Sequence, residues 1–356
     1  MASPPLTELA DDPIALTRAL VDIESVSGEE KQITDAVELA LREAGHLSVQ
    51  RVGNVVRAAT NLGRGQRVIL AGHLDTVPPH GNLPSTQDGD RLYGCGTSDM
   101  KSGAALALHL ALTLPEPDHD VTYLFYDCEE IEAERNGLAV IGRTHPEWLA
   151  GDFAVLLEPT HGLVEAGCQG TLRVRLAVGG RRAHAARAWK GVNAIHGAAP
   201  VLAVLADYRP RRPIIDECEY HEGLNAVGIC GGVAGNVIPD RCEIDINHRF
   251  APDRTPDEAI AHLRELFAGH ELEIVDVAPG ARPGLTNPVA REFVAAVGAP
   301  AVAKLGWTDV ARFAALGIPA LNYGPGDPSL AHSPDEHVEL AKITQGAAVL
   351  RRWLTG

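Results

Sequence analysis

Residues 68–103, VILAGHLDTVPPHGNLPSTQDGDRLYGCGTSDMKSG, contain the pattern that decides the fold. The apolar run 68–71 predicts a buried strand, and His73 and Asp75 follow at its carboxyl end, where open α/β sheets usually place their functional groups. Further along, a Gly-Cys-Gly turn leads into Asp99 at the start of an apolar helix. An imidazole and carboxylates therefore stand at the ends of secondary structure, which is typical of a metal site.

Strands and helices alternate around this stretch. Periodicity predicts helices over 13–23 and 29–44, and apolar runs predict strands over 52–59, 67–71, 121–126 and 154–157. The last two of these strands lead into Glu129-Glu130 and into Glu158. Alternation of this kind predicts a largely parallel, doubly wound α/β sheet.

The pattern changes near Gly170, where polar and apolar residues begin to alternate as in a half-exposed strand. The elements expected from here are a strand over 171–178, a helix over 192–208, strands over 225–230 and 241–249, a helix over 256–268 and a strand over 271–277. This βαββαβ order is the ferredoxin-like unit. After a Pro- and Gly-rich linker, helices over 288–297, 310–316 and 336–354 and a strand over 318–322 resume the first pattern. We therefore predict a discontinuous catalytic domain, 1–168 and 281–356, with a second domain, 169–280, inserted into it.

The charge and composition of the chain limit the classes of molecule that it could bind. The formal net charge of -16 argues against nucleic acid or an anionic membrane surface. A small anionic substrate stays open, because a bound metal and a few arginines reverse the local field. We expect neither a signal peptide nor a transmembrane segment, and the six scattered cysteines favour reduced thiols over disulfides or a zinc knuckle. These features together predict a cytoplasmic protein.

Five residues could assemble one metal site: His73, Asp99, Glu130, Glu158 and His332. Two imidazoles and three carboxylates suit two divalent ions, with zinc favoured. Three carboxylates and one hydroxide would balance the charge of two ions, and a bridging hydroxide is the nucleophile that ions about 3.5–4 Å apart generate near neutral pH. Singly, each residue also has a plain structural explanation, since Asp99 is a competent N-cap and a lone histidine after a strand is more often structural. Only the complete set favours the metal site.

The ordered motifs resemble the M20 family of co-catalytic zinc hydrolases, which includes deacylases, carboxypeptidases and dipeptidases. The resemblance is carried by HLDTVP at 73–78, SDMKSG at 98–103, Glu129-Glu130, EPT at 158–160 and His332, and it spans nearly the whole chain. Within the family, the motifs are most similar to the succinyl-diaminopimelate desuccinylase branch of high-GC bacteria. The resemblance implies that the inserted domain is a lid and dimerisation domain, and that the protein is a homodimer.

The resemblance also implies a role for each residue of the set. Asp99 would bridge two zinc ions, with its peptide bond to Met100 in the cis form. His73 and Glu158 would hold one ion, and Glu130 and His332 the other, with cobalt as a substitute for zinc. Asp75 would orient His73. Glu129 would be the general base that takes a proton from the attacking water and returns it to the leaving amine.

The inserted domain would contribute further residues to the site. His184, in GGRRAH at 179–184, matches the histidine that crosses from the partner subunit to stabilise the oxyanion. The residues alone favour a solvated hairpin histidine instead. Asn236 lies in a segment that resembles the family's dimer-side substrate loop, and Arg249 matches an arginine that binds a substrate carboxylate, although a surface strand arginine is the alternative. Gly326, from the catalytic domain, would line the pocket.

Several positions depart from the family's usual pattern. They are Cys95, Cys128 and Ile131 near the expected metal centre and Gln169, which stands where better-known desuccinylases carry a basic residue. All five expected ligands are present, so the departures concern substrate identity. The leading hypothesis is hydrolysis of N-succinyl-LL-2,6-diaminopimelate to succinate and LL-2,6-diaminopimelate, in lysine and peptidoglycan precursor synthesis. A related deacylase or peptidase, such as an acetylornithine deacetylase, is the alternative, and the intact Glu129 argues against a binding protein without activity.

Overall fold

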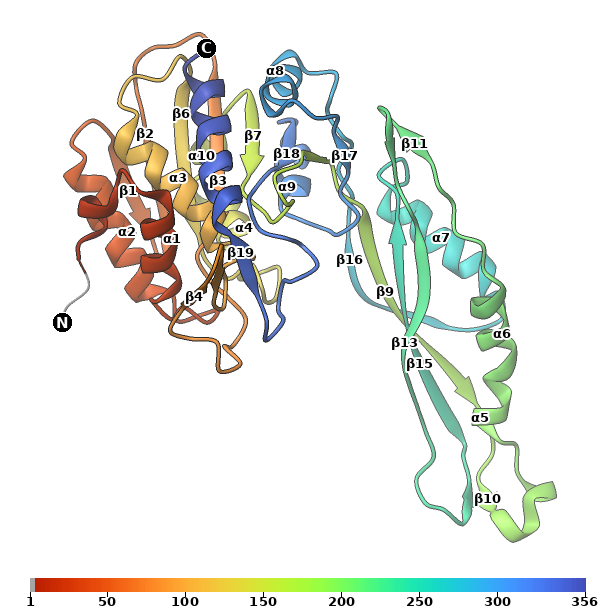
Figure 1. Cartoon of the computed structure of the whole chain (residues 1–356). Helices are drawn as coiled ribbons and strands as arrows, with labels where there is room; N and C mark the ends of the chain where they lie inside the picture. The colour runs from red at the N-terminus through yellow and green to blue at the C-terminus, as the bar shows by residue number, and fades with distance from the viewer. Residues whose placement is uncertain (1–3) are drawn as a thin grey trace. The chain divides into compact units, whose positions relative to one another are not determined.

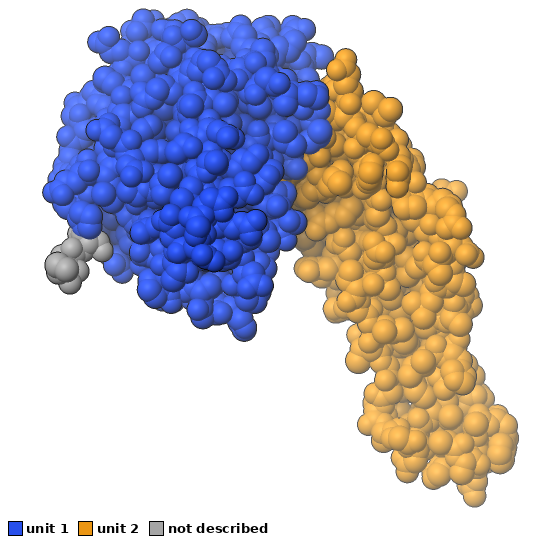
Figure 2. All heavy atoms as spheres, in the orientation of Figure 1, with its two compact units in different colours: residues 1–166, 283–302, 312–356 blue, residues 167–282, 303–311 orange. Residues whose placement is uncertain are grey.

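Residues 4–356 are described by a computed structural model in which contacts divide the chain into two units (Figure 2). Unit 1 contains the described residues up to Ala166, together with Pro283–Val302 and Arg312–Gly356. Unit 2 contains Gly167–Arg282 and Ala303–Ala311. Among residues 4–356, no helix combines the length and the apolar character needed to cross a membrane.

The eight-stranded sheet of unit 1 has the order β1-β2-β6-β3-β7-β18-β8-β17 (Figure 1). Its strands are β1 (Ser48–Val52), β2 (Val55–Ala59), β3 (Arg67–His73), β6 (Asp120–Tyr126), β7 (Phe153–Leu156), β8 (Glu165–Ala166), β17 (Val302–Ala303) and β18 (Ala320–Asn322). The four central strands β6, β3, β7 and β18 are parallel, whereas β1, β2 and β8 pair antiparallel with their neighbours. The predicted α/β fold with a mostly parallel central sheet is confirmed, with antiparallel strands toward its edges.

Helices pack around this sheet. They are α1 (Pro13–Val21), α2 (Lys31–Glu43), α3 (Lys101–Thr113), α4 (Gly137–Thr144), α8 (Pro288–Val297), α9 (Val310–Ala315) and α10 (Leu340–Leu354), with short 3₁₀ helices at Leu6–Leu9 and Pro146–Leu149. Asp12 caps α1 by accepting from the backbone N–H groups of Ile14 and Ala15, as its position before Pro13 predicts. The apolar helix α3 packs on β3 and is itself contacted by α1 and α10. It is buried from Lys101 to Ala111, because apolar residues occupy all of its faces.

The last helix begins later than the sequence predicts. We expected a helix from 336, but β19 (His337–Glu339) pairs antiparallel with β5 (Arg91–Tyr93), which in turn pairs with β4 (Thr86–Asp88). Backbone hydrogen bonds to a distant strand therefore replace the first helical turn, and α10 begins at Leu340. This pairing brings the residues before α10 to the loop that precedes α3.

Unit 2 is built on a four-stranded antiparallel sheet of order β13-β15-β9-β16 (Figure 1). Its main elements are β9 (Gly170–Gly179), α5 (Ala194–Gly197), α6 (Ala199–Asp207), β13 (Gly223–Gly231), β15 (Arg241–Phe250), α7 (Pro256–Leu266) and β16 (Leu272–Ala278). The order along the chain and in the sheet is the ferredoxin-like arrangement that the sequence predicts. Alternate residues of β9 and β15 are buried and form the core with residues of α5, α6 and α7.

The helix predicted over 192–208 is interrupted. It starts at Ala194, where Asn193 accepts from the N–H groups of Ile195 and His196, and it divides at Ala198 into α5 and α6. Pro200 lies in the first turn of α6, and a proline has no N–H with which to continue the preceding helix. The interruption therefore has a local cause that the apolar periodicity does not reveal.

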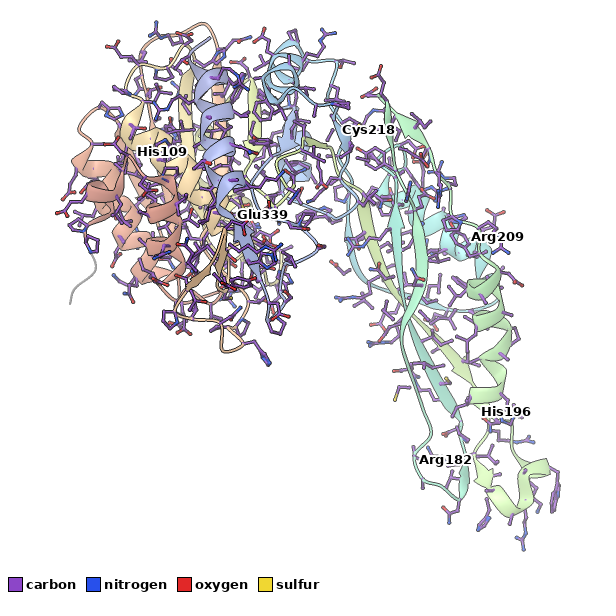
Figure 3. The ribbon with its side chains drawn as sticks, viewed as in Figure 1. His109, Arg182, His196, Arg209, Cys218 and Glu339 are labelled. Carbon is purple, nitrogen blue, oxygen red and sulfur yellow. The ribbon has the colours of Figure 1, made fainter. Side chains whose placement is uncertain are left out.

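Short elements complete unit 2. β10 (Ala183–His184) pairs with β14 (Val237–Ile238), β11 (Ile214–Ile215) pairs with β12 (Cys218–Glu219), and a 3₁₀ helix spans Ala185–Lys190. Arg182, labelled in Figure 3, precedes β10 and forms an ion pair with Asp240 at 2.8 Å. The strands are too short to be recognised from sequence alternation.

The contact units differ in detail from the predicted domain limits. Cys168 and Ala281 exchange backbone hydrogen bonds of 3.0 Å, so both belong to unit 2. Residues 303–311, which we expected in the catalytic domain, also group with unit 2, where the indole N–H of Trp307 donates to the carbonyl of Pro279. The functional assignment of the two domains stays a prediction, since contacts alone do not show what each unit does.

Candidate active site

The ends of the central parallel strands converge at one edge of the sheet in unit 1. His73 ends β3, the Glu129-Glu130 pair follows β6, and Glu158 follows β7. Asp99 lies in the loop before α3, and His332 lies in the segment before β19. Because parallel strands present their carboxyl ends at a common edge, residues far apart in the sequence meet there.

His73 is held by one ring nitrogen and offers the other to Asp99. Its Nδ1 lies 3.0 Å from the carbonyl oxygen of Asp75, and its Nε2 lies 3.2 Å from Oδ1 of Asp99. A carbonyl only accepts, so Nδ1 carries a proton and Nε2 is the nitrogen directed at Asp99. Burial lowers the pKa of His73, but hydrogen bonds to Asp75 and Asp99 outweigh it and raise the pKa well above its usual value.

His332 approaches Asp99 from the other side. Its Nε2 lies 2.7 Å from Oε1 of Glu130 and 3.5 Å from Oδ2 of Asp99. Hydrogen bonds to Asp99 and Glu130 raise the pKa of His332 to about 10, although the side chain is 48% exposed. The same two histidines lower the pKa of Asp99, against the effect of its burial. Negative charge is therefore concentrated between the two imidazoles.

Two groups of ligand atoms share Asp99. His73, Asp99 and Glu158 form one group, and Asp99, Glu130 and His332 form the other, with the ligand atoms of each group within 4.8 Å of one another. Imidazole nitrogens and carboxylate oxygens are the donors that zinc accepts in hydrolytic sites. The donor set and its spacing fit two divalent metal ions, and the protonated imidazoles of this arrangement stand where positive charge is favoured.

Asp75 holds the backbone of the adjacent glutamates. Its Oδ1 accepts from the N–H of Glu129 and its Oδ2 from the N–H of Glu130, both at 3.1 Å, and Ser27 donates to Oδ2 at 2.7 Å. Burial raises the pKa of Asp75, but hydrogen bonds from His73 and Ser27 outweigh this effect and the net pKa is lowered. A buried, ionised carboxylate thus links the strand end at His73 to the Glu129-Glu130 segment. Glu129, His73 and Glu130 also lie together as a group within 4.8 Å.

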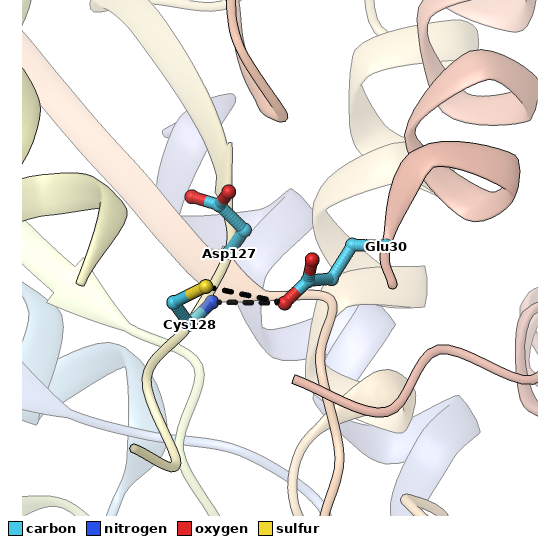
Figure 4. Close-up of side chains that lie close together, drawn as sticks. All are labelled: Glu30, Asp127 and Cys128. Atoms are coloured by element: carbon cyan, nitrogen blue, oxygen red, sulfur yellow. Dashed lines mark hydrogen bonds between the residues drawn. The ribbon is translucent and has the colours of Figure 1, made fainter. Parts of the chain in front are cut away.

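Glu30 supports the same segment one residue earlier (Figure 4). Its Oε1 accepts from the backbone N–H of Cys128 at 3.2 Å and from the Cys128 thiol at 3.5 Å. Cys128 has a left-handed backbone with φ of 56°, a conformation that persists only where the surroundings hold it. Burial and the nearby charge of Glu30 raise the pKa of the Cys128 thiol to about 12. The protonated thiol is therefore a hydrogen-bond donor to Glu30.

Sequence reasoning assigned no role to Glu30 or Glu336. Glu336 is buried beside the site and accepts from backbone N–H groups of the loop that carries Asp99. Both residues act on backbone groups across long sequence separations, so no motif marks them. Their burial as charged residues is the signal, and it is visible only in the folded chain.

The residues expected to bind substrate fall in both units. Gly326 lies in unit 1, where an added Cβ would come within 2.3 Å of the Ser98 carbonyl oxygen, so only glycine fits there. His184, Asn236 and Arg249 lie in unit 2. His184 and Asn236 are close together, since β10 pairs with β14 and the N–H of Ala185 donates to the carbonyl of Asn236 at 2.8 Å. Arg249 lies near the end of β15, opposite Gly223 and Thr171.

Gln169, the neutral departure from the family pattern, is buried in unit 2. Its side-chain Nε2 donates to the carbonyl of Leu305 at 3.0 Å. The segment 303–311 is thereby attached to the start of β9. Gln169 has a structural contact of its own in addition to any role toward substrate.

The peptide bond between Asp99 and Met100 is cis, as the family resemblance implies. Residues 69–356 match the family model described as Peptidase family M20/M25/M40. The chain is 56% identical over 99% of its length, and 100% of the relative's, to a protein of Mycobacterium tuberculosis named putative succinyl-diaminopimelate desuccinylase DapE. It is 49% identical, over 99% of its length and 98% of the relative's, to the succinyl-diaminopimelate desuccinylase of Corynebacterium glutamicum.

A solved structure shows the same fold. The Bacillus subtilis YXEP protein, described as a dinuclear metal binding peptidase from the M20 family, aligns with a TM-score of 0.69 and 18% identity over 98% of both chains. The match to the family model covers most of the chain, and the two relatives cover it almost completely. The chain therefore belongs to peptidase family M20/M25/M40.

Proposed function

We propose that this protein is a di-zinc amide hydrolase that removes succinate from N-succinyl-LL-2,6-diaminopimelate and releases LL-2,6-diaminopimelate. The observation that carries the proposal is the convergence of His73, Asp99, Glu130, Glu158 and His332 in two groups that share Asp99. The names of the two relatives, which match over nearly the full chain, support the substrate. The product would serve lysine and peptidoglycan precursor synthesis.

The proposed metal ligands divide as the geometry groups them. His73 and Glu158 would hold one ion, Glu130 and His332 would hold the other, and Asp99 would contribute one oxygen to each. Bound zinc, or cobalt in its place, would polarise the scissile carbonyl. It would also lower the pKa of a bound water molecule to a value near neutral pH. The chain's own carboxylates neutralise most of the positive charge, which keeps the site suited to an anionic attacking group.

Glu129 would move the proton. Asp75 fixes the backbone of Glu129 and Glu130. With the backbone held in this way, the Glu130 carboxylate would ligate a metal ion while the Glu129 carboxylate serves as the base. Glu129 takes the proton of the attacking water and delivers it to the nitrogen of the leaving amine as the amide bond breaks. Without that delivery, the amine would leave as an unstable anion.

His184 would stabilise the oxyanion that forms during attack. Its Nδ1 accepts from the backbone N–H of Ala186 at 3.0 Å. The proton of the neutral ring is therefore on Nε2, which makes Nε2 a donor without any need for a positive charge. The local turn supports a role as an oxyanion donor, which the sequence alone does not favour over a solvated histidine.

A homodimer would bring His184 to the site of the other subunit. β13 is an edge strand of the unit 2 sheet, and along it Val227 and Ile229 are 62% and 54% exposed. Ile195 and Leu202, on α5 and α6, are also exposed. An uncovered edge strand with apolar side chains is prone to pair with another strand. A second copy of the chain, related by a two-fold axis, would cover this edge with the same residues.

Few residues among the proposed site residues could neutralise the negative charge of the substrate. Arg249 is a permanent cation, although burial lowers its pKa, and it would bind a substrate carboxylate. Asn236 and Gly326 would supply further polar contacts from the side chain and the backbone. We place the enzyme in the cytoplasm, in keeping with six cysteines that are all free thiols.

The direct test compares two substrates on the zinc-loaded protein. We expect kcat/KM for N-succinyl-LL-2,6-diaminopimelate to exceed that for N-acetyl-ornithine by about a hundredfold or more. Glu129→Gln serves as the inactive control. The neutral Gln169 favours the second candidate, an acetylornithine deacetylase, because it removes a cation from the expected acyl pocket. Turnover of the acetyl compound alone would establish that alternative and overturn the desuccinylase.

A further inference from the structure

Glu336 receives three backbone N–H groups from the loop that carries Asp99. Its Oε1 accepts from Ser98 at 2.8 Å and from Asp99 at 3.0 Å, and its Oε2 accepts from Gly96 at 3.0 Å. The side chain is only 2% exposed. Burial raises the pKa of Glu336, and the three N–H donors act against this shift because they favour the deprotonated carboxylate.

The loop and the segment around Glu336 are joined at further points. Ser98 donates its hydroxyl to the carbonyl of His337 at 2.8 Å and accepts from the N–H of Asp327 at 3.2 Å. The N–H of Gly94 donates to the carbonyl of Glu336 at 3.1 Å. Hydrogen bonds therefore connect residues 94–99 to residues 327–337, and the segment 327–337 contains His332.

His332 has an unusual backbone conformation within this segment. Its φ of 62° is left-handed, a region that residues other than glycine rarely adopt. Such a conformation persists only where surrounding contacts determine it. Ser333 donates its backbone N–H and its hydroxyl to the carbonyl of Leu330, and these contacts close the turn around His332. Glu336 then joins this turn to the loop before α3, where it accepts from the backbone N–H of Asp99.

We propose that Glu336 is a positioning residue that holds His332 in register with Asp99, so that binding of the second metal ion depends on it. This inference rests on the metal centre of the proposed function. Asp99 and His332 come from segments far apart in the sequence. Glu336 lies in the same segment as His332, and its carboxylate accepts from the backbone N–H of Asp99. The group Asp99, Glu130 and His332 needs this register, whereas His73 and Glu158 are placed by β3 and β7.

The substitution Glu336→Gln tests the role with little change of shape. An amide keeps one accepting oxygen but turns an NH₂ group toward a backbone N–H, so at least one of the three contacts is lost. We expect the metal-free variant to fold and to bind one metal equivalent as the wild type does. Its affinity for the second equivalent should fall about tenfold or more, as is usual when a residue that orients a ligand is removed.

Asp120→Asn is the matched control. Asp120 is also buried and accepts from three consecutive backbone N–H groups, those of Leu62, Gly63 and Arg64 at 2.7, 3.1 and 3.0 Å. It begins β6, at the end of the strand opposite the metal ligands. The same chemical change there should lower the melting temperature of the metal-free protein and leave both metal affinities unchanged.

The measurement is a cobalt titration of each metal-free protein, followed by d–d absorption and repeated with zinc in competition with a chelator. The proposal would be supported if the wild type binds metal in two steps and only Glu336→Gln shows a weaker affinity in the second step. Equal binding by Glu336→Gln and Asp120→Asn would overturn it and leave Glu336 a structural residue. If Glu336→Gln does not fold, Glu336→Asp keeps the charge but is one methylene too short to hold all three N–H groups, and an unchanged second step there would overturn the proposal.

No substrate enters this titration. A wild-type protein that binds two ions but does not cleave the succinyl substrate would therefore contradict the proposed function while the role of Glu336 stands. A wild-type protein that binds a single ion would contradict both.

Discussion

Oδ1 of Asp99 lies 3.2 Å from Nε2 of His73. The other oxygen of the same carboxylate faces His332 at 3.5 Å, so Asp99 stands between two imidazoles that belong to different ligand groups. One carboxylate with an oxygen toward each group is the geometry that a bridging ligand needs.

The adjacent glutamates should separate metal binding from proton transfer. Glu130→Gln should lose the ion that Glu130 shares with His332, because Glu130 supplies a ligand oxygen. Glu129→Gln should retain both ions and lose kcat by about a thousandfold, because only the base is removed. Metal analysis of the dialysed proteins together with steady-state kinetics checks both. Equal metal content in the two variants would reverse the roles.

Metal binding should release protons near neutral pH. Hydrogen bonds that His332 donates to Asp99 and Glu130 raise the pKa of His332 to about 10 in the metal-free chain, so this ring is protonated at neutral pH and must deprotonate to ligate. Metal affinity should therefore rise as pH increases through the neutral range. Calorimetric titration in buffers of different ionisation enthalpy counts the protons released. Zero release would show that His332 is already neutral or does not ligate.

Subunits that carry different defects should complement each other. Alone, His184→Ala lacks the oxyanion donor and Glu129→Gln lacks the base, so both are expected to be inactive. In a mixed dimer, one site combines an intact Glu129 with the partner subunit's His184. Equal co-expression should recover about a quarter of wild-type activity, since half of the dimers are mixed and each contains one intact site. A histidine that serves its own subunit would give no recovery.

Unit 2 should lose stability in mild acid because of His248. This residue is buried on β15 among Glu222, Arg254, His262 and Arg211, and neither ring nitrogen has a hydrogen-bond partner within residues 4–356. Burial lowers the pKa of His248 to about 4. The unfolded chain, with an ordinary pKa of about 6.5, therefore binds a proton first as pH falls, and stability present above about pH 6.5 is lost toward pH 4.

The expected loss is about 2 kcal/mol between about pH 7.5 and about pH 5. Urea unfolding of the wild type and of His248→Leu at both pH values isolates this residue, because other titrating groups cancel in the difference. The variant should show a smaller loss by that amount. The same pH dependence in both proteins would mean that His248 does not titrate as its burial implies.

The ends of apolar strands made most of the site predictable. His73, Glu130 and Glu158 each follow a run that could only be a buried strand, and parallel strands bring their ends to one edge. The ferredoxin-like order of unit 2 was equally visible in the alternation of β9 and β15. Residue type and strand position together therefore predicted which side chains come together at this edge of the sheet.

The supporting residues were not predictable in this way. Glu30 and Glu336 hold backbone N–H groups, and any residue type can supply those, so no motif pairs the carboxylate with its target. The role of Asp75 toward His73 was implied by the resemblance, but its contacts to the N–H groups of Glu129 and Glu130 were not. Short strands such as β19 form through a distant partner and carry no periodicity. The attachment of residues 303–311 to unit 2 depends on single hydrogen bonds, including that of Gln169, which composition cannot show.

Anomalous diffraction from crystals of the zinc-loaded protein tests the bridging role of Asp99 most directly. A bridging Asp99 predicts two zinc peaks about 3.5–4 Å apart, one beside His73 and Glu158 and one beside Glu130 and His332, with an oxygen of Asp99 bound to each. A single peak, or two peaks of which only one contacts Asp99, would contradict it.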